Sequence, residues 1–325
     1  MYVLGIDGGG TKTSGVVADE SGRVYMQTIG GSSNPNALTQ EKFEEVLSGL
    51  LAELENQNPH IFAQLSVCFA GMSGVGESGG DAEFAKLLKK QLPAQTDVVV
   101  VNDAYNALYS GTLGNPGIVQ IAGTGAISFG INYEDKRARA GGWGYLFDDG
   151  GSGYYLGNEA LRAVFEHFDG RGPSTVLTER LLNFFDARHV PELTGKIYSP
   201  KEHPRAVIAK LSPIVVEAAQ AGDPVAEGII CKACEEMMKC IEACHNKLFD
   251  FDHPTVIVLS GGVFTHPGQF VWYLNELSRK SLPNVIFRET RVDPVGGAVI
   301  GGLKAMGISS IEESFAERLN RELKK

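Results

Sequence analysis

Short hydrophobic blocks that stop abruptly at glycines mark two places in the chain. Residues 2–7 form a run that ends in Gly8-Gly9-Gly10, and residues 118–122 form a second run that ends in Gly123-Thr124-Gly125. Such runs are typical of β-strands. Each is followed by two further short strands in a meander, at 14–19 and 23–29 in the first case and at 126–132 and 136–141 in the second. The same succession of elements therefore begins twice.

Buried strands and amphipathic helices complete each half. Residues 65–70, 97–101 and 255–259 are continuously apolar, as expected of central strands covered on both faces, and a further strand is expected near 285–289. Apolar residues three and four positions apart, such as Phe43, Leu47 and Leu50, predict helices. We expect these helices at 39–56, 81–91, 155–168, 174–187, 203–221, 224–249, 294–306 and 310–325.

These elements predict an α/β fold of two lobes. A turn-rich Gly-Asn-Pro-Gly stretch at 114–117 precedes the second glycine-ended strand, and we place the lobe boundary there. The expected first lobe is 1–115 together with the C-terminal helix 310–325, and the expected second lobe is 116–309. A chain of 325 residues has room for two such domains.

Composition excludes several classes of function. The net charge is −10 and Lys and Arg do not gather in long runs, so we expect no nucleic-acid partner. The first residues lack the pattern of a signal peptide, and no apolar run reaches the ~18 residues of a membrane helix. Five cysteines, four of them close together, do not resemble a secreted disulfide framework. We expect a cytoplasmic protein.

The first glycine turn has the chemistry of a phosphate site. Glycines after a strand let several backbone amides approach a phosphate closely. Asp7, at the strand end, is placed to hold hydrated Mg²⁺. The spacing fits neither a Walker A loop nor a Rossmann fingerprint, and an ordinary hairpin is the alternative. The expected phosphate-binding residues are Gly9, Gly10, Thr11, Lys12 and Thr13.

A second and a third glycine turn strengthen this interpretation. Gly123, Thr124 and Gly125 repeat the strand, glycine and hydroxyl pattern, so the two turns together could hold a triphosphate, that of ATP. Gly261 and Gly262 interrupt a buried strand and offer backbone without side chains for adenosine. Unrelated tight hairpins, and a plain helix-entry turn at Gly261, remain the alternatives.

One carboxylate is placed to act as a base. Asp103 follows the buried strand 97–101, where α/β folds place ligands, and precedes a helix. Phosphoryl transfer to an alcohol needs a carboxylate that accepts the hydroxyl proton. The alternative role for Asp103 is that of a helix N-cap.

A glycine-rich loop at 141–153 is a candidate sugar site. Trp143 offers an aromatic face to the C–H side of a sugar, and Asp149 offers an acceptor to its hydroxyls. A solvated acidic turn is the alternative. The early loop with Asn34 could contribute another amide, or could be a plain turn.

Four cysteines within residues 231–244 do not predict a metal site. Cys234 and Cys244 belong to a buried stripe of the helix expected at 224–249, and Cys231 and Cys240 lie off that stripe. Four sulfurs spread along one continuous helix cannot converge on one ion. We expect these side chains to act as small hydrophobes.

With these motifs in order, the chain resembles the N-acetylglucosamine kinase branch of the BadF/BadG-type ATPase family, within the actin/hexokinase/Hsp70 superfamily. The motifs that carry the resemblance are 4–13, 67–74, 98–108, 120–130, 141–153, 217–229, 256–264 and 293–303. The resemblance implies two ribonuclease H-like (actin-like ATPase) domains with a central interlobe cleft. It also implies use of ATP and Mg²⁺, a small-molecule sugar substrate, and a homodimer formed through helices of the second lobe.

The resemblance assigns roles to individual residues. Asp103 is implied to be the base for the 6-hydroxyl of an amino sugar, and Gly222 is implied to join the nucleotide-binding set. The implied sugar-binding residues are Asn34, Asp103, Ala126, Ile127, Gly142, Trp143 and Asp149. Where the family often reads Gly-Asp-Glu-Gly-Ser, this chain has residues 148–152 without the Glu, which predicts altered contacts with the sugar. N-acetylglucosamine, N-acetylmuramic acid and free glucosamine are the candidate substrates.

Two other functions fit parts of the pattern. An ATPase that activates a 2-hydroxyacyl-CoA dehydratase resembles this fold, but it carries an iron–sulfur cluster between two subunits and needs a suitably placed thiol pair. A non-catalytic sugar sensor would not require Asp103 and both glycine turns. The amino-sugar kinase accounts for more of the sequence than either alternative.

Overall fold

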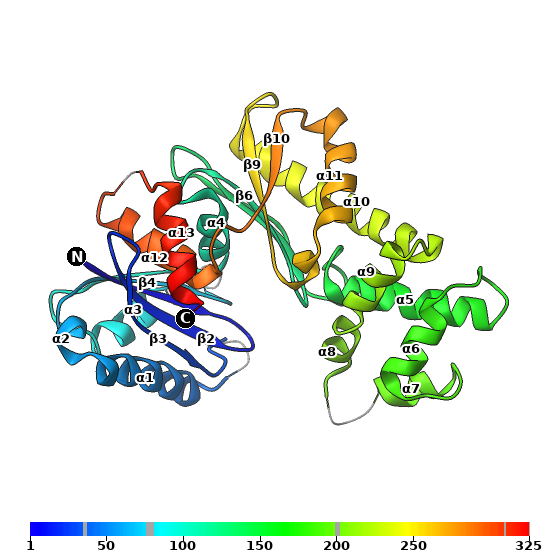
Figure 1. Cartoon of the computed structure of the whole chain (residues 1–325), viewed down its shortest axis with the longest axis horizontal. Coiled ribbons are helices and arrows are strands. Elements are labelled where there is room, and N and C mark those ends of the chain that lie inside the picture. The colour runs from blue at the N-terminus through cyan, green and yellow to red at the C-terminus, as the bar shows by residue number, and fades with distance from the viewer. Residues whose placement is uncertain (35–37, 76–80, 199–201, 309, 325) are drawn as a thin grey trace. The chain divides into compact units, whose positions relative to one another are not determined.

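The computed structural model describes residues 1–34, 38–75, 81–198, 202–308 and 310–324 (Figure 1). The chain forms two compact units. Unit 1 comprises Met1–Asn115 and Thr290–Lys325, and unit 2 comprises Pro116–Glu289. Each unit contains one five-stranded sheet. The expected α/β class is confirmed, and within the described residues no helix combines the length and apolarity needed to cross a membrane.

The sheet of unit 1 brings the ends of its three parallel strands to one edge. Its strands are β1 (Tyr2–Gly8), β2 (Thr13–Asp19), β3 (Val24–Gly30), β4 (Leu65–Met72) and β5 (Asp97–Asn102), in the order β3-β2-β1-β4-β5. The meander β1-β2-β3 is antiparallel, whereas β4 runs parallel to β1 and β5 parallel to β4. Asp7 pairs with Gly71 and Met72 pairs with Asn102, so the first glycine turn and Asp103 both follow strands that end at this edge.

Unit 2 repeats this sheet with a different sequence. Its strands are β6 (Gly117–Ala122), β7 (Ala126–Ile131), β8 (Arg137–Gly141), β9 (Thr255–Ser260) and β10 (Val285–Glu289), in the order β10-β9-β6-β7-β8. The meander β6-β7-β8 is again antiparallel, and β9 and β10 run parallel to β6. The order is therefore that of unit 1, as the repeated succession of elements predicts.

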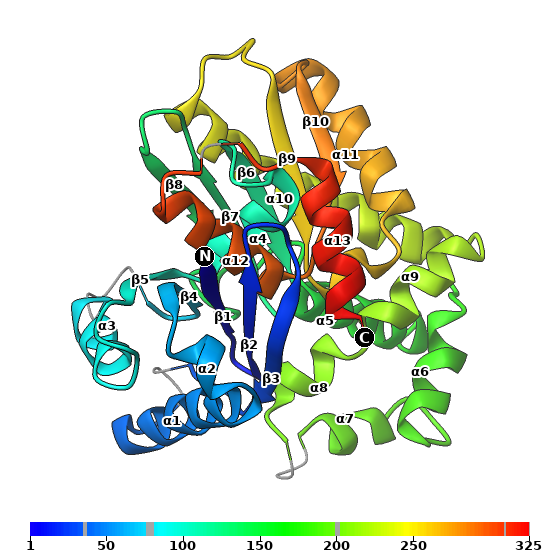
Figure 2. The same cartoon turned by 60° about the vertical axis from the view of Figure 1, so that its left-hand side comes forward.

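Helices cover the sheet of unit 1 (Figure 2). They are α1 (Gln40–Gln57), α2 (Pro59–Phe62), α3 (Asp81–Lys89), α4 (Ala104–Thr112), α12 (Pro294–Ala305) and α13 (Glu313–Leu323). In α1 the apolar stripe with Phe43, Leu47 and Leu50 is buried, and Thr39 caps the helix by accepting a hydrogen bond from the Lys42 amide at 3.4 Å. The expected helix 39–56 thus matches α1 closely.

Residues 290–309 belong to unit 1, not to the second lobe as expected. The cause is the glycines of α12, which let this helix approach its neighbours closely. A Cβ on Gly297 would overlap the backbone carbonyl of Asn106 in α4, and a Cβ on Gly5 of β1 would lie 2.7 Å from the Val299 amide. At these two glycines backbone packs directly on backbone, and α12 is fixed against both β1 and α4.

The helices of unit 2 differ from expectation in three places. They are α5 (Gly153–Phe168), α6 (Leu177–Phe185), α7 (Glu192–Ile197), α8 (Pro204–Ala209), α9 (Ser212–Gln220), α10 (Pro224–Leu248) and α11 (Gly268–Ser281), with a 3₁₀ turn at Gly262–Thr265. The single helix expected at 203–221 is two helices, because Pro213 in the first turn of α9 cannot continue a helix from α8. Helices α7 and α11 were not predicted.

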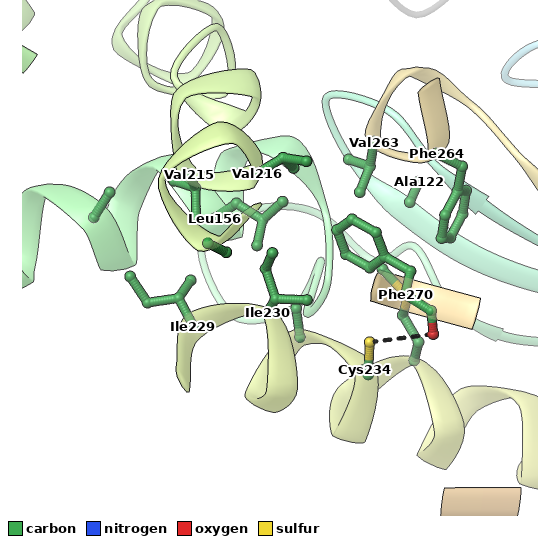
Figure 3. Packing of buried hydrophobic residues seen from close by; sticks show 14 of the residues in the cluster. Ala122, Leu156, Val215, Val216, Ile229, Ile230, Cys234, Val263, Phe264 and Phe270 are labelled. Carbon is green, nitrogen blue, oxygen red and sulfur yellow. Dashed lines mark hydrogen bonds between the residues drawn. The ribbon is translucent and has the colours of Figure 1, made fainter. Parts of the chain in front are cut away.

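The core of unit 2 forms around α10 (Figure 3). Phe270 of α11 is fully buried beside Cys234, whose thiol donates to the Phe270 carbonyl at 3.9 Å. Cys234 and Cys244 are buried in the predicted stripe, and Cys231 and Cys240 are only partly buried. Burial raises the pKa of the Cys244 thiol to about 12 and also raises that of Cys231.

The packing of α12 predicts the effect of adding one methyl group. We expect Gly297→Ala to lower the free energy of unfolding by about 1–3 kcal/mol or more, because its Cβ would overlap backbone that cannot rotate away. Gly228→Ala in α10 is the control, since nothing lies within 4 Å of that position. There we expect a gain of about 0.4–1 kcal/mol. Urea unfolding measures both, and equal effects would contradict this account.

Candidate active site

The first glycine turn is a tight connection between β1 and β2. Its amide at Gly9 donates to the Lys12 carbonyl at 2.9 Å, and the Ser73 amide donates to the Gly8 carbonyl at 2.7 Å. Gly10, Thr11 and Lys12 are exposed at the tip. Thr13, expected among the phosphate-binding residues, is fully buried, and its hydroxyl donates to the Gly31 carbonyl at 2.7 Å. This bond ties the start of β2 to the end of β3.

Asp7 is held in place by a buried amide. Asn106 in α4 is fully buried and its Nδ2 donates to Asp7 Oδ1 at 2.8 Å and to the Ile6 carbonyl at 3.1 Å. Burial raises the pKa of Asp7, while the Asn106 hydrogen bond and the nearby Lys12 charge act in the opposite direction. The carboxylate therefore has a fixed orientation at the end of β1.

A cavity in unit 1 opens in front of Asp7. It has a volume of about 460 Å³, and Lys12 and Asp293 also line it. Asp293 stands at the N-terminus of α12 but makes no capping hydrogen bond, and its charge contributes to the raised pKa of Asp7. Sequence reasoning missed Asp293. The available signal was an Asp directly before the Pro that begins a glycine-rich helix.

Asp103 stands at the start of α4 but does not cap the helix with its side chain, which was the alternative to its role as a base. Its side chain makes no capping hydrogen bond, and Asn102 Oδ1 accepts from the Ala104 amide at 3.0 Å. Burial raises the pKa of Asp103 to about 7, and the charge of Asp7 adds to the rise. A carboxylate with a pKa near neutrality can accept a proton and release it at physiological pH.

Asn34 lies beside the first turn. Its side-chain amide nitrogen is 3.9 Å from the position that a Cβ on Gly10 would occupy. Ser33 before it is fully buried. The structure therefore brings Asn34 to the glycine turn, and the prediction that it contacts a sugar stays a prediction.

The second glycine turn is fixed to the start of α5. Within the turn the Gly123 amide donates to the Gly125 carbonyl at 2.9 Å. The Gly153 amide donates to the Gly123 carbonyl at 2.7 Å, and the Tyr154 amide donates to the Thr124 carbonyl at 3.3 Å. Thr124 itself is exposed, so its hydroxyl can reach a ligand.

Asp149 is buried behind this turn. Its Oδ1 accepts from the Ala126 amide at 3.1 Å, and its Oδ2 accepts from Arg205 Nη2 at 2.8 Å. Asp149 also has a left-handed backbone, with φ of 67°. The solvated acidic turn considered from sequence therefore does not describe Asp149. Sequence reasoning missed Arg205, which lay unremarked inside the single helix expected at 203–221.

Trp143 is the exposed part of the same loop. Its side chain is 63% exposed, and the Arg139 guanidinium lies 4.1 Å from the ring centroid. Asp148 Oδ2 accepts from the Trp143 amide at 2.9 Å, which fixes the loop backbone.

The ends of the 141–153 loop lie close to other elements of unit 2. A Cβ on Gly142 would be 3.0 Å from Ile127, so these two expected sugar-site residues are neighbours. At Gly150, where the family Glu is missing, the Cβ of Glu236 lies 2.7 Å from the position that a Cβ would take. A larger residue at 150 would therefore have to displace Glu236.

The remaining glycines have different explanations. Gly261 has φ of 108°, and a Cβ there would overlap the backbone of Ala122 at the end of β6, so packing alone requires glycine. Gly262 begins the 3₁₀ turn with nothing within 4 Å of a Cβ, and Gly222 has φ of 85° between α9 and α10 in equally open space. The helix-entry reading of Gly261 is therefore sufficient within unit 2, and a role with adenosine stays a prediction.

The raised pKa of Asp103 has a consequence for stability. Its carboxyl group has an ordinary pKa of 3.8, so between pH 3.8 and about 7 the folded state holds a proton that the unfolded state has lost. This contribution to stability is complete below 3.8 and is lost as pH rises through about 7. We expect Asp103→Asn to raise the thermal midpoint more at about pH 8 than at about pH 4. Equal shifts would contradict the raised pKa.

Relatives of known sequence cover almost the whole chain. The chain is 32% identical over 303 residues to an N-acetylmuramic acid/N-acetylglucosamine kinase from Clostridium acetobutylicum. The aligned region covers 92% of this chain and 97% of that protein. The chain is also 34% identical over 317 residues to an N-acetyl-D-glucosamine kinase from Dictyostelium discoideum, and the aligned region covers 93% of this chain and 98% of that protein.

Solved structures agree on the fold. A candidate N-acetylglucosamine kinase from Chromobacterium violaceum has a TM-score of 0.70 at 26% identity, covering 92% of this chain and 98% of that one. A ROK family glucokinase from Streptomyces griseus has a TM-score of 0.59 at 18% identity, and the match covers 93% of this chain and 98% of that one. At this identity the likeness shows only that the fold is shared. The expected actin-like ATPase type of fold is thus confirmed. Residues 4–302 also match a family model, and the chain belongs to the BadF/BadG/BcrA/BcrD ATPase family.

Proposed function

We propose that the chain is an ATP-dependent kinase that phosphorylates the 6-hydroxyl of an amino sugar, N-acetylglucosamine or N-acetylmuramic acid, with glucosamine as a further candidate. The observation that carries the proposal is Asp103, a partly buried carboxylate with a pKa of about 7 at the sheet edge where β1 ends in its glycine turn. Relatives named as kinases of these sugars support the choice of substrate class. A third relative, at 27% identity, is a glucosamine kinase from Vibrio cholerae.

Asp103 is the general base in this proposal. Its carboxylate accepts the proton of the sugar hydroxyl as the hydroxyl oxygen attacks the γ-phosphorus of ATP. The bond between the γ-phosphorus and the β–γ bridging oxygen breaks, and ADP leaves with those electrons. A pKa near 7 leaves a large fraction of Asp103 ionised at neutral pH and still basic enough to take the proton.

Each unit by itself carries residues that we propose as nucleotide contacts. In unit 1 the exposed tip of the first turn offers backbone amides, the Thr11 hydroxyl and the Lys12 ammonium to phosphate oxygens. In unit 2 the exposed Thr124 does the same. Thr13 is left out of this set because its hydroxyl is used inside unit 1. The remaining proposed contacts, from the resemblance, are Gly9, Gly10, Gly123, Gly125, Gly222, Gly261 and Gly262.

The carboxylates beside Lys12 fit a magnesium ion. Mg²⁺ prefers oxygen ligands and keeps several of its waters, so one or two carboxylates facing a cavity suffice. Asp7 and Asp293 line the same cavity and would hold the ion, Asp7 in the orientation set by Asn106. When bound, Mg²⁺ neutralises charge on the β- and γ-phosphates.

Each unit by itself also carries residues that we propose as sugar contacts. Asn34 beside Gly10 and Asp103 belong to unit 1, and Asp149 belongs to unit 2. Ala126 and Ile127 adjoin the second turn, and Gly142 and Trp143 form the neighbouring loop. A homodimer and a cytoplasmic location remain part of the proposal on the strength of the resemblance alone. The dehydratase activator needs a thiol pair at a subunit interface, and Cys234 and Cys244 are buried within α10.

An assay across a sugar panel tests the proposal. The panel contains glucosamine, N-acetylglucosamine, N-acetylmuramic acid, N-acetylmannosamine and glucose, and the readout is ADP release with the product identified by NMR. We expect a 6-phosphate of N-acetylglucosamine or N-acetylmuramic acid as the main product. ATP consumption that stays at background with every sugar would sink the assignment.

The base is tested in the same assay by one variant and one control. We expect Asp103→Asn to lower kcat by at least about a thousandfold, because the amide cannot accept the proton, with nucleotide binding unchanged. Asp97→Asn at the exposed start of β5 is the matched control and should behave as the wild type. Near-normal turnover of Asp103→Asn would remove Asp103 from the mechanism.

A further inference from the structure

Arg205 of unit 2 contacts both Asp149 and the second glycine turn. Its guanidinium is ion-paired to Asp149 at 2.8 Å, and its Nη2 lies 2.7 Å from the position that a Cβ on Gly125 would take. The same guanidinium lies over the ring of Tyr145, 5.2 Å from its centroid. Only a glycine at position 125 lets the arginine approach the turn this closely, so the arginine, the turn and Asp149 form one packed group.

The helix that carries Arg205 is held rigidly. Arg205 is in the first turn of α8, where its amide donates to His203 Nδ1 at 3.2 Å. A Cβ on Gly157 of α5 would overlap the Ile208 carbonyl, and one on Gly153 would lie 3.2 Å from the Ala209 carbonyl. Helix α8 therefore lies directly on the backbone of α5, whose first residues also hold the second glycine turn. The position of the guanidinium relative to that turn is fixed from both sides.

Asp149 needs such support to act as a sugar ligand. A carboxylate has about four lone-pair positions on its two oxygens. Among the hydrogen bonds of the described residues, the Ala126 amide takes one position on Oδ1 and Arg205 takes one on Oδ2, so each oxygen keeps one further acceptor position. Because Asp149 is only 3% exposed, it would be an uncompensated buried charge without the arginine.

We propose that Arg205 is a positioning residue for the amino sugar, which orients Asp149 and joins it to the Gly123–Gly125 turn. This inference rests on the proposed function, in which Asp149 contacts the sugar. The arginine acts through Asp149 and not on the reacting atoms. Its loss should therefore weaken sugar binding more than it slows the chemical step or weakens ATP binding.

The test is a comparison of steady-state constants in two Arg205 variants. We expect Arg205→Gln to raise the KM for the amino sugar by about tenfold or more, with the KM for ATP changed by less than about threefold. Arg205→Lys keeps the charge but lacks the planar fork, so it should fold like the wild type and still raise the sugar KM. Arg180→Gln is the control, because Arg180 is equally exposed (34% against 33%) and also ion-paired, to Glu217.

A double-mutant cycle separates positioning from general destabilisation. If Arg205 acts through Asp149, the effects of Arg205→Gln and Asp149→Asn on the sugar KM will be far from additive, while Arg180→Gln will add independently. A wild-type sugar KM in Arg205→Lys, a rise only in the ATP KM, or full additivity with Asp149→Asn would each overturn the inference. The wild type is measured first: if it phosphorylates no sugar of the panel, the proposed function fails and this inference fails with it.

Discussion

A single buried amide organises the chemistry of unit 1. Asn106 donates to the ends of both central strands, at Ile6 and Gly71, and to the carboxylate of Asp7. It belongs to α4, the helix that begins directly after Asp103. A buried amide that makes several such bonds is costly to move, so Asp7 and Asp103 keep a fixed relation. Burial, together with repulsion from the Asp7 carboxylate, then raises the pKa of Asp103 to about 7.

Glycines of α12 allow this helix to pack closely against α4, which carries Asn106. Gly297 lets α12 approach the backbone of α4 at Asn106, and the N-terminus of the same helix carries Asp293 into the cavity beside Asp7. Unit 2 uses the same device for a different purpose. There Gly153 and Gly157 let α8 lie on α5, and the arginine at the start of α8 reaches the second glycine turn. In both units, glycines let a helix pack closely enough to place a charged group beside an expected site residue: Asp293 near Asp7 in unit 1, and Arg205 next to Asp149 in unit 2.

The sequence predicted the parts that depend on local patterns. The two glycine-ended strands and their meanders gave the sheets and their repeated order, and the end of β5 pointed to Asp103. It did not reveal contacts that depend on where helices pack. Placing 290–309 in the second lobe was wrong because nothing local shows that Gly297 faces Asn106. Asp293 and Arg205 were missed for the same reason, and the burial of Thr13 was not foreseen because it depends on how the start of β2 pairs with the end of β3.

The most direct test of the central claim is the pH dependence of kcat/KM for the sugar in the wild type. If Asp103 is the base and its pKa is near 7, kcat/KM will fall tenfold per pH unit below about pH 7 and level off above it. Asp7→Asn, which removes the neighbouring charge, should move that inflection to lower pH wherever activity is measurable. A kcat/KM that stays constant from about pH 5 to about pH 8 would contradict the account.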